Sequence, residues 1–219
     1  MTQNNPSTVP DALRTALRHH QRGELRQAEA IYRKVLLVEP NNADALHLLG
    51  VIANQTGKNE LAVDLIGKAI GVNNAVPLYH SNAGNAYFAL NRLEEAIACY
   101  RRALSLSPGY HEAHYNLGSA LAGQGKLEEA AECYRRAVSL RPDLYMAHFN
   151  LGNILARQWK MEEAAECFSR AVALKPDFHE AYYNMGNALA DQGKLLRIQA
   201  VLLVVFLGRQ LVGLAQVGL

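Results

Sequence analysis

Three stretches of the chain are near copies of one another: GNAYFALNRLEEAIACYRRALSLSP (84–108), GSALAGQGKLEEAAECYRRAVSLRP (118–142) and GNILARQWKMEEAAECFSRAVALKP (152–176). Each copy begins 34 residues after the previous one. A supersecondary unit of this length cannot bury its own apolar face, so neighbouring units must stack and share a core. Stacked units expose an extended surface rather than a closed pocket, which favours binding over catalysis.

Each unit reads as two helices joined by a short turn. In the unit 111–144, Ala113 and Leu117 recur at helical spacing, and Gly118 would let a partner helix approach closely. Gly125 then supplies a helix stop. The segment KLEEAAECYRRAVSL predicts a second helix that ends before the next proline. The expected fold is therefore all-α.

Composition and charge argue against a disordered chain, a nucleic-acid-binding protein and a secreted protein. Of the 219 residues, 50% are hydrophobic and 19% are charged, which is typical of a globular chain. The net charge is +2 with dispersed Lys and Arg, so no footprint for nucleic acid is visible. The opening MTQNNPSTVPDALRTALRHH lacks the apolar core of a secretory signal, so a cytoplasmic location is expected.

No pattern of catalytic residues stands out. The sequence contains no HExxH, GxSxG or CxxC motif and no glycine-rich phosphate loop. We therefore expect a protein that is not an enzyme and needs no cofactor or metal. A longer parent chain could still carry a catalytic domain.

The cysteines and three histidines repeat with the same period. Cys99, Cys133 and Cys167 occupy equivalent places in successive units, as do His80, His114 and His148. Stacked units lie roughly 10 Å apart, which is too far for a disulfide or a shared metal ion. We expect packing thiols, and histidines that pack between helices with the polar tip of the ring satisfied.

These patterns resemble the tetratricopeptide repeat family. The signature of the family falls on Leu117, Gly118, Ala130, Tyr134, Ala137 and Pro142, and it recurs as Leu151, Gly152, Ala164, Phe168, Ala171 and Pro176. The resemblance covers about 9–195 and implies a right-handed α-solenoid of helix-turn-helix repeats. It gives five complete units (9–42, 43–76, 77–110, 111–144, 145–178) and a partial sixth (179–195), between a flexible N-terminus (1–8) and an atypical apolar tail (196–219).

The resemblance also implies a peptide-binding groove lined by the first helix of each unit. Two polar rows and one mostly aromatic row recur there: Asn82, Asn116, Asn150 and Asn184; Asn85, Ser119, Asn153 and Asn187; and Ser81, Tyr115, Phe149 and Tyr183, with Phe88 one turn further along. Asparagine is a mediocre helix former, so its repetition needs a reason. Either the first row bridges consecutive repeats, or the carboxamides pair with the backbone of an extended peptide; the two can coexist.

These groove positions are neutral. Tetratricopeptide modules that clamp the acidic C-terminus of heat-shock chaperones use Lys and Arg in this part of the groove, so such a receptor is not expected. The expected partners are protein or peptide clients.

A finer resemblance concerns the runs YNLGS (115–119), FNLGN (149–153) and YNMGN (183–187). With EEAAECYRRA they are most similar to the repeats of O-linked N-acetylglucosamine transferase. This implies, as an alternative, that the chain is the truncated, substrate-presenting N-terminal region of such a glycosyltransferase.

Trp159 stands where other units have Gly57, Asn91, Gly125 and Gly193. Glycine and asparagine suit the left-handed conformation that ends a helix, whereas tryptophan adopts it at an energetic cost. Trp159 is therefore expected to strain the turn. Alternatively, it is an exposed aromatic anchor for a partner.

The repeat pattern stops after Leu195. The tail LRIQAVLLVVFLGRQLVGLAQVGL contains an apolar run, 200–207, that is too short to span a membrane. It is either an apolar helix that replaces the second helix of the sixth unit or a foreign ending from a truncation or altered reading frame, and we favour the second. Its apolar surface predicts self-association.

Overall fold

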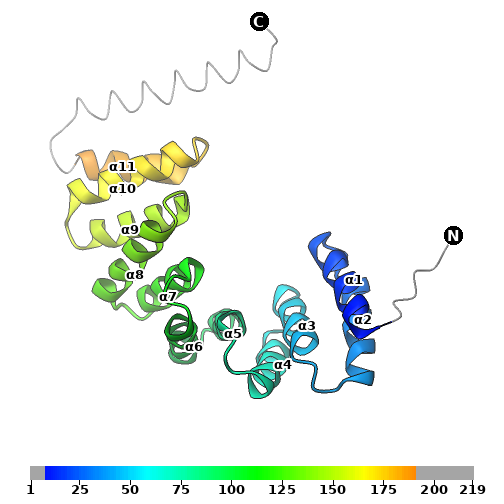
Figure 1. Cartoon of the computed structure of the whole chain (residues 1–219). Helices are drawn as coiled ribbons and strands as arrows, with labels where there is room; N and C mark the ends of the chain where they lie inside the picture. The colour runs from blue at the N-terminus through cyan, green and yellow to red at the C-terminus, as the bar shows by residue number, and fades with distance from the viewer. Residues whose placement is uncertain (1–7, 191–219) are drawn as a thin grey trace, which may run out of the picture. The chain divides into compact units, whose positions relative to one another are not determined.

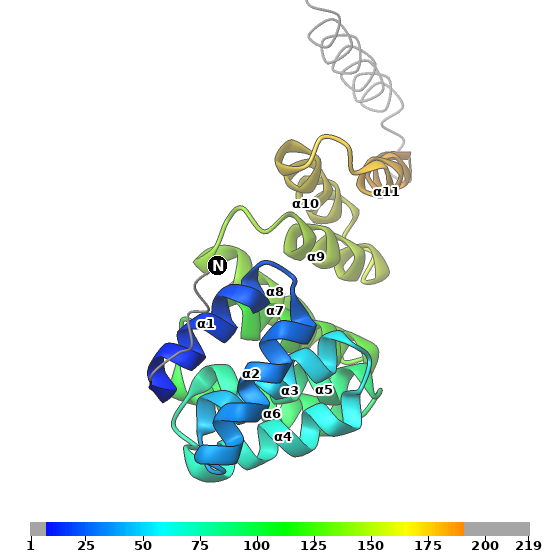
Figure 2. The ribbon, with the colours of Figure 1, turned by 90° about the vertical axis from the view of Figure 1, so that its right-hand side faces the viewer.

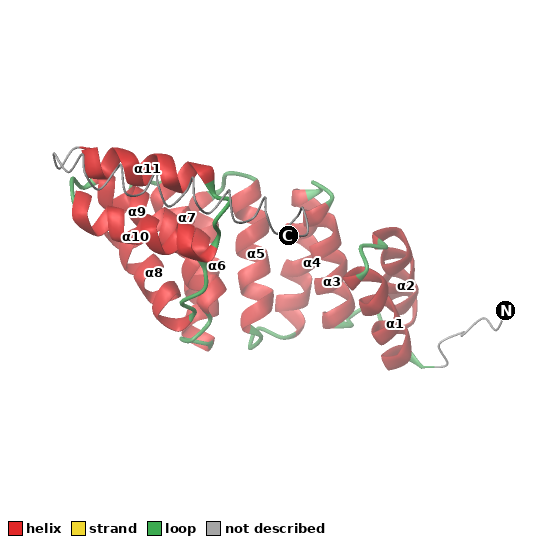
Figure 3. Ribbon diagram, turned by 90° about the horizontal axis from the view of Figure 1, so that it is seen from above, coloured by secondary structure: helices red, strands yellow, loops and turns green. Residues whose placement is uncertain are grey.

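The computed structural model describes residues 8–190, and in this range the chain forms eleven helices and no strand (Figures 1 and 3). The expected all-α class is confirmed. Two compact units divide the chain, Met1–Gln124 (unit 1) and Gly125–Leu219 (unit 2). The predicted flexibility of residues 1–7 and the predictions for the tail 196–219 fall outside the described residues.

Helices of two kinds alternate along the chain. The first helices are α1 (Val9–Gln21), α3 (Ala43–Gln55), α5 (Pro77–Ala89), α7 (His111–Gly123), α9 (Tyr145–Arg157) and α11 (His179–Ala190). The second helices are α2 (Leu25–Val38), α4 (Asn59–Val72), α6 (Leu93–Leu106), α8 (Leu127–Leu140) and α10 (Met161–Leu174). The first helices begin every 34 residues, from Val9 to His179.

Each unit is built by stacking neighbouring helices. In unit 1, α1 packs against α2, α3 against α4 and α5 against α6, and each pair contacts the next first helix. In unit 2, α9 lies between α8 and α10, and α10 also packs against α11 (Figure 2). Short connections between successive helices produce this antiparallel arrangement.

Glycine in the first helix sets the distance between the two helices of a pair. A Cβ atom at Gly84 would lie 2.5 Å from Cε1 of Tyr100, and one at Gly152 would lie 2.7 Å from Cε1 of Phe168. At Gly50 the nearest atom is Cγ1 of Ile66, at 2.6 Å. Because no side chain fits at these distances, the large residue of the second helix packs directly on the glycine backbone.

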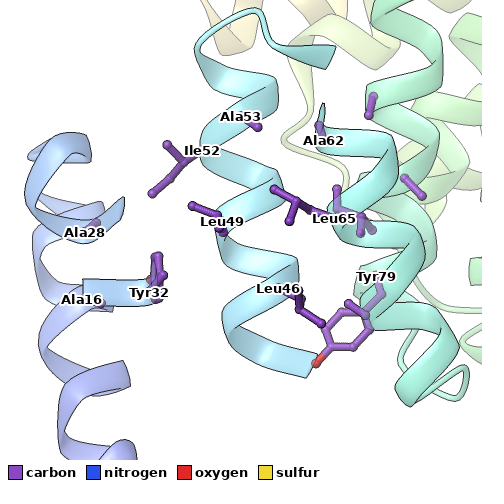
Figure 4. Packing of buried hydrophobic residues seen from close by; sticks show 14 residues of the cluster. Ala16, Ala28, Tyr32, Leu46, Leu49, Ile52, Ala53, Ala62, Leu65 and Tyr79 are labelled. Carbon is purple, nitrogen blue, oxygen red and sulfur yellow. The ribbon is translucent and has the colours of Figure 1, made fainter. Parts of the chain in front are cut away.

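Alanines complete the close packing. Ala62, Ala69, Ala96 and Ala103 are 0% exposed on the second helices of unit 1. Larger residues such as Tyr32 on α2 and Tyr79 on α5 fill the space around α3 (Figure 4). Small residues at the contacts and large ones in the gaps give the interior its density.

A left-handed residue ends the first helix in several pairs. Gly23, Gly57 and Gly125 have φ of 76°, 77° and 76°, Asn91 has 57° and Trp159 has 61°. The left-handed conformation predicted for Trp159 is confirmed. Its side chain is 80% exposed, so packing does not compensate for the strain.

Within residues 8–190, no helix is both long enough and apolar enough to cross a membrane.

Candidate binding surfaces on the first helices

An amide ladder crosses the first helices of unit 1. The Nδ2 of Asn82 donates to Nε2 of His47 at 2.8 Å, the Nδ2 of Asn85 donates to Oδ1 of Asn82 at 3.3 Å, and the Nδ2 of Asn116 donates to Oδ1 of Asn85 at 3.0 Å. His47, Asn82, Asn85 and Asn116 are the members of this ladder, and they come from α3, α5 and α7. The ladder therefore links three successive first helices.

Asn85 is the centre of the ladder. Its Oδ1 also accepts a hydrogen bond from the hydroxyl of Tyr100, at 2.8 Å. Both lone pairs of this oxygen are thus used within the protein. Asn85 therefore holds the helices together, and little of its carboxamide is left for a ligand.

His47 ends the ladder in the core. It is 3% exposed, and its ring lies 4.5 Å from the ring of Tyr79. Desolvation lowers the pKa of His47 to about 4, although the nearby Asp44 carboxylate opposes the shift. The neutral ring accepts the hydrogen bond from Asn82 at Nε2. Asp44 in turn accepts a hydrogen bond from the hydroxyl of Tyr79, at 2.5 Å.

A bond of the same kind joins two first helices in unit 2. The Nδ2 of Asn184 on α11 donates to Oδ1 of Asn153 on α9, at 2.8 Å. Phe168 stands where unit 1 has Tyr100, so no phenol hydroxyl competes for Asn153. Asn187 is exposed and makes no side-chain hydrogen bond with any described residue.

The bridging role considered for the first asparagine row is therefore present at Asn82, Asn116 and Asn184. Two participants in this network, His47 and Tyr100, were not predicted from the sequence. His47 could have been found from the 34-residue period, because it lies one period before Ser81, a member of the third row. The sequence does not indicate a role for the hydroxyl of Tyr100, because the equivalent residue Phe168 has no hydroxyl and the position is therefore explained by packing alone.

The third row is not uniformly exposed. Tyr183 is 70% exposed on α11, and Tyr115 on α7 is half-buried. Phe149 is 4% exposed, and its ring centroid lies 5.8 Å from that of Phe168 and 4.7 Å from that of Phe178. The expectation that Phe149 lines an open groove is therefore wrong, because its ring completes the core of unit 2.

Ser81 does not line an open groove either, whereas Ser119 is half-buried. Ser81 is 2% exposed and is hydrogen-bonded with Tyr110. The hydroxyl of Ser119 donates to the backbone carbonyl of Tyr115, at 3.2 Å. Phe88 on α5 is 41% exposed and does offer apolar surface.

The repeated histidines pack as expected. Nε2 of His80 lies 2.9 Å from the carbonyl oxygen of Asn74, Nε2 of His114 lies 3.0 Å from that of Pro108, and Nε2 of His148 lies 2.9 Å from that of Pro142. A carbonyl oxygen only accepts, so each Nε2 carries the proton and donates. The predicted satisfaction of the polar tip of the ring is confirmed at all three histidines.

Cys99 and Cys167 are free thiols whose side chains are partly buried. Burial raises the pKa of Cys99 and of Cys167 to about 11. A thiol with a raised pKa is a poor nucleophile at neutral pH. These residues contribute packing.

The geometry defines the class of tandem helix-turn-helix repeat proteins, with first helices that carry a polar ladder. Family profiles described as TPR repeat match residues 84–125, 119–158 and 160–193, and one described as tetratricopeptide repeat matches 13–72. The chain belongs to the tetratricopeptide repeat family. No curated protein matches the sequence as a whole.

Solved structures share this fold. PilF of Pseudomonas aeruginosa superposes with a TM-score of 0.80 at 19% identity, with 91% of each chain covered. MamA has a TM-score of 0.67 at 24% identity, covering 75% of this chain and 96% of its own. YrrB, described as a TPR protein with an unusual peptide-binding site, has a TM-score of 0.66 at 24% identity, covering 82% of this chain and 92% of its own. At these identities the likeness concerns the fold.

Proposed function

We propose that the chain is a non-catalytic protein-interaction module whose first helices bind extended peptide segments. The observation that supports this most is the set of amides with unused groups on these helices. Asn116 and Asn184 each donate through Nδ2 to the preceding first helix, and their Oδ1 atoms have no hydrogen-bond partner among residues 8–190. The bridging bond fixes the side chain and leaves its acceptor available.

Such an acceptor suits the backbone of a peptide. An extended peptide presents N–H groups that need a partner once they leave water. A carboxamide oxygen that is already held in place accepts one at a small loss of side-chain entropy. Pairing of this kind reads the backbone, so it would tolerate many client sequences.

Exposed aromatic side chains supply the apolar part of the surface. Tyr183 lies beside Asn184 and, at 70% exposure, leaves most of its ring open to a ligand. Phe88 offers a smaller contact in unit 1. Aromatic rings are common anchors in binding surfaces because they bury much area with few rotatable bonds.

A comparison of variants in unit 2 tests the proposal. Tyr183→Ala and Asn187→Ala change exposed side chains of α11, and Arg170→Ala is the matched control on the exposed face of α10. Binding to a peptide array should fall by roughly fivefold or more for each α11 variant, on the scale of about 1 kcal/mol per lost contact, and should be unchanged for the control. Equal binding by all three variants would remove α11 as the site.

A second pair of variants examines the amide acceptors. Asn116→Ala together with Asn150→Ala removes two members of the first row. The proposal requires weaker peptide binding by this double variant at a temperature where it remains folded. Asn85→Ala serves as a reference. Because the carboxamide of Asn85 is engaged in hydrogen bonds within the protein, its loss should lower stability more than it lowers peptide binding.

A second candidate function is the presentation of protein substrates to an attached glycosyltransferase. The runs YNLGS, FNLGN and YNMGN favour it through their resemblance to the repeats of O-linked N-acetylglucosamine transferase. Sequencing the gene downstream of codon 194 decides between the two. An in-frame catalytic domain would support this candidate, and its absence would leave the independent interaction module.

A further inference from the structure

The rows of the proposed binding surface change character within unit 1. Continued back by one and two periods, the second row reads Leu17, Val51, Asn85 and Ser119, on α1, α3, α5 and α7. In the first row, Leu48 on α3 likewise precedes the asparagines of α5 and α7. Both rows are therefore apolar on α3 and polar on α5 and α7, and Leu17 extends the apolar part to α1.

Leu17 and Val51 flank the junction of α1 and α3. Nε2 of His20 donates to Oε1 of Gln55 at 3.0 Å, which brings the last turns of these two helices together. Leu17 precedes His20 by three residues and Val51 precedes Gln55 by four, so each lies one turn earlier on the same face of its helix. The two apolar side chains therefore lie next to the same junction, one turn away from the hydrogen bond.

Three aliphatic side chains form a small apolar surface at this junction. Leu17 is 40% exposed and Val51 is half-buried. Leu48 lies one turn before Val51 on α3 and packs against the core cluster that contains Tyr32. We call Leu17, Leu48 and Val51 the apolar junction. Its base is fixed by the core, and part of its surface remains open.

The apolar junction stands where the third repeat has a complete hydrogen-bond network. There, the Oδ1 of Asn85 accepts hydrogen bonds from Tyr100 and Asn116. Leu17 offers no acceptor, and the buried hydroxyl of Tyr32 has no partner among the described residues. Leucine at this position therefore lowers stability relative to asparagine. Departures of this kind from the local pattern are concentrated at functional sites.

We propose that the apolar junction binds one bulky apolar side chain of the extended peptide whose backbone contacts the amides of α5 and α7. The inference rests on the proposed function, because the same peptide crosses the first helices of unit 1. Packed helices lie roughly 10 Å apart and an extended chain rises about 3.3 Å per residue. About six residues therefore separate the apolar side chain from the level of Asn116.

Size and charge favour a single uncharged segment as the occupant. Stable interfaces between folded chains bury roughly 1,600 Å² in total, far more than three partly buried aliphatic side chains offer. The first row contains a charged residue on α1, Arg14, whose guanidinium pairs with Asp11 at 3.1 Å. The side chain in the apolar junction selects the client, and the backbone contacts on α5 and α7 tolerate the rest of its sequence.

Two kinds of peptide test this selection on the full chain. A host peptide of about twelve residues of Ser, Thr and Gly is long enough to cross the surface and carries no large apolar side chain. In the second kind, one Leu is moved through the host sequence. At its best position, Leu should tighten binding by roughly five- to tenfold, as measured by fluorescence anisotropy.

A double variant removes the apolar junction. Leu17→Asn with Val51→Ser copies the residues of α5 and α7 onto α1 and α3. The introduced carboxamide offers an acceptor to the hydroxyl of Tyr32, so the variant should fold, which circular dichroism checks. It should bind the host as tightly as the wild type does but gain less than twofold from Leu. Leu37→Asn changes a leucine of α2 that is 83% exposed, and this matched control should keep the full gain.

The outcomes separate this inference from the proposed function. Asn116→Ala should weaken both peptides by the same factor, because their backbones are alike. Host binding that depends on Asn116 but gains nothing from Leu overturns the apolar junction alone, as does a gain that survives in the double variant. Binding of neither peptide overturns both proposals.

Two further measurements keep the test decisive. If the double variant does not fold, Val51→Ser replaces it and should reduce the gain from Leu to less than about threefold. Light scattering examines a second copy of the chain as the occupant. Concentration-dependent association of the wild type that the variant loses would assign the apolar junction to contacts between copies and overturn the proposal.

Discussion

Tyr32 and Tyr100 occupy equivalent places on α2 and α6, but their hydroxyl groups have different surroundings. The hydroxyl of Tyr100 donates to Asn85, whereas the buried hydroxyl of Tyr32 has no partner among the described residues. Leu17 stands in the first repeat where Asn85 stands in the third. Burial raises the pKa of Tyr32 to about 12, so the group stays neutral but unsatisfied. The same residue type therefore stands at two equivalent positions, and its hydroxyl group stabilises the fold at one of them and destabilises it at the other.

Removing these two hydroxyl groups should have opposite effects on stability. Tyr100→Phe leaves Asn85 with one donor fewer and should lower the free energy of unfolding by about 1 kcal/mol. Tyr32→Phe removes an unsatisfied buried group and should leave that free energy unchanged or raise it slightly. Urea unfolding followed by circular dichroism measures both. Equal losses in the two variants would contradict the assigned hydrogen-bond network.

His47 gives the fold a dependence on acid. Its pKa is lowered from 6.5 in an unfolded chain to about 4 in the folded one, mainly by burial. Between these values the unfolded chain binds more protons, so stability decreases as the pH falls from about 6.5 to about 4, by up to about 3 kcal/mol. His47→Gln, whose side chain can still accept a hydrogen bond, should lose less stability over this range. The difference between the two urea-unfolding curves isolates His47 from the carboxylates, and identical curves would exclude it as the cause.

The turn between α9 and α10 shows how a helix pair tolerates an unsuitable residue. Trp159 has a φ of 61°, as Asn91 has 57° in the equivalent turn between α5 and α6. The backbone hydrogen bonds are also equivalent: the amide of Lys160 donates to the carbonyl of Leu155, and that of Arg92 to the carbonyl of Tyr87. The packing of the helices on both sides therefore imposes the conformation, whichever residue stands there.

Trp159→Gly should relieve this strain. We expect the variant to be more stable by about 0.5–1 kcal/mol, because glycine adopts the left-handed region without a Cβ clash and little packing is lost. Asn91→Gly is the matched control, with a smaller effect because asparagine tolerates this region. A lower melting temperature for Trp159→Gly would show that the indole makes a stabilising contact. Unchanged peptide binding by the variant would also exclude Trp159 as a partner anchor.

At the scale of the whole chain, charge should have little influence on binding. The chain carries a net charge of +2, and the proposed site residues of both units are neutral. Screening by salt weakens contacts between charges and leaves hydrogen bonds and apolar contacts largely intact. Peptide affinity should therefore change less than about threefold between 20 mM and 200 mM salt. A steep loss of affinity over this range would point to charged residues elsewhere on the chain as the binding groups.

The C-terminal sequence should control solubility. Residues 196–219 contain the apolar run 200–207 and no Asp or Glu. An exposed apolar segment of this kind favours association between copies. A chain ending at Lys194 should therefore stay monomeric at concentrations where the full chain associates. Light scattering on the two chains decides, and equal association of both would exclude the tail as its cause.

The sequence alone determined the helices and their pairing. A period of 34 residues, glycines such as Gly84 and Gly152, and alanines such as Ala96 and Ala164 repeat because every unit meets the same neighbours, so the pattern records the packing. The same period separated the cysteine and histidine rows and predicted the left-handed turn at Trp159. These features depend on local backbone geometry or on register, and both can be read along a chain.

Only the tertiary structure decided which polar and aromatic residues remain available. Phe149 and Tyr183 share a place in the repeat, yet one fills the core against Phe178 and the other is 70% exposed. The Oδ1 of Asn85 accepts hydrogen bonds from Tyr100 and Asn116, whereas Asn187 makes no side-chain hydrogen bond with any described residue. Exposure and hydrogen-bond partners depend on which side chains neighbouring helices bring to each position. A repeat motif fixes the position, and the non-repeating residues around it determine what the position can bind.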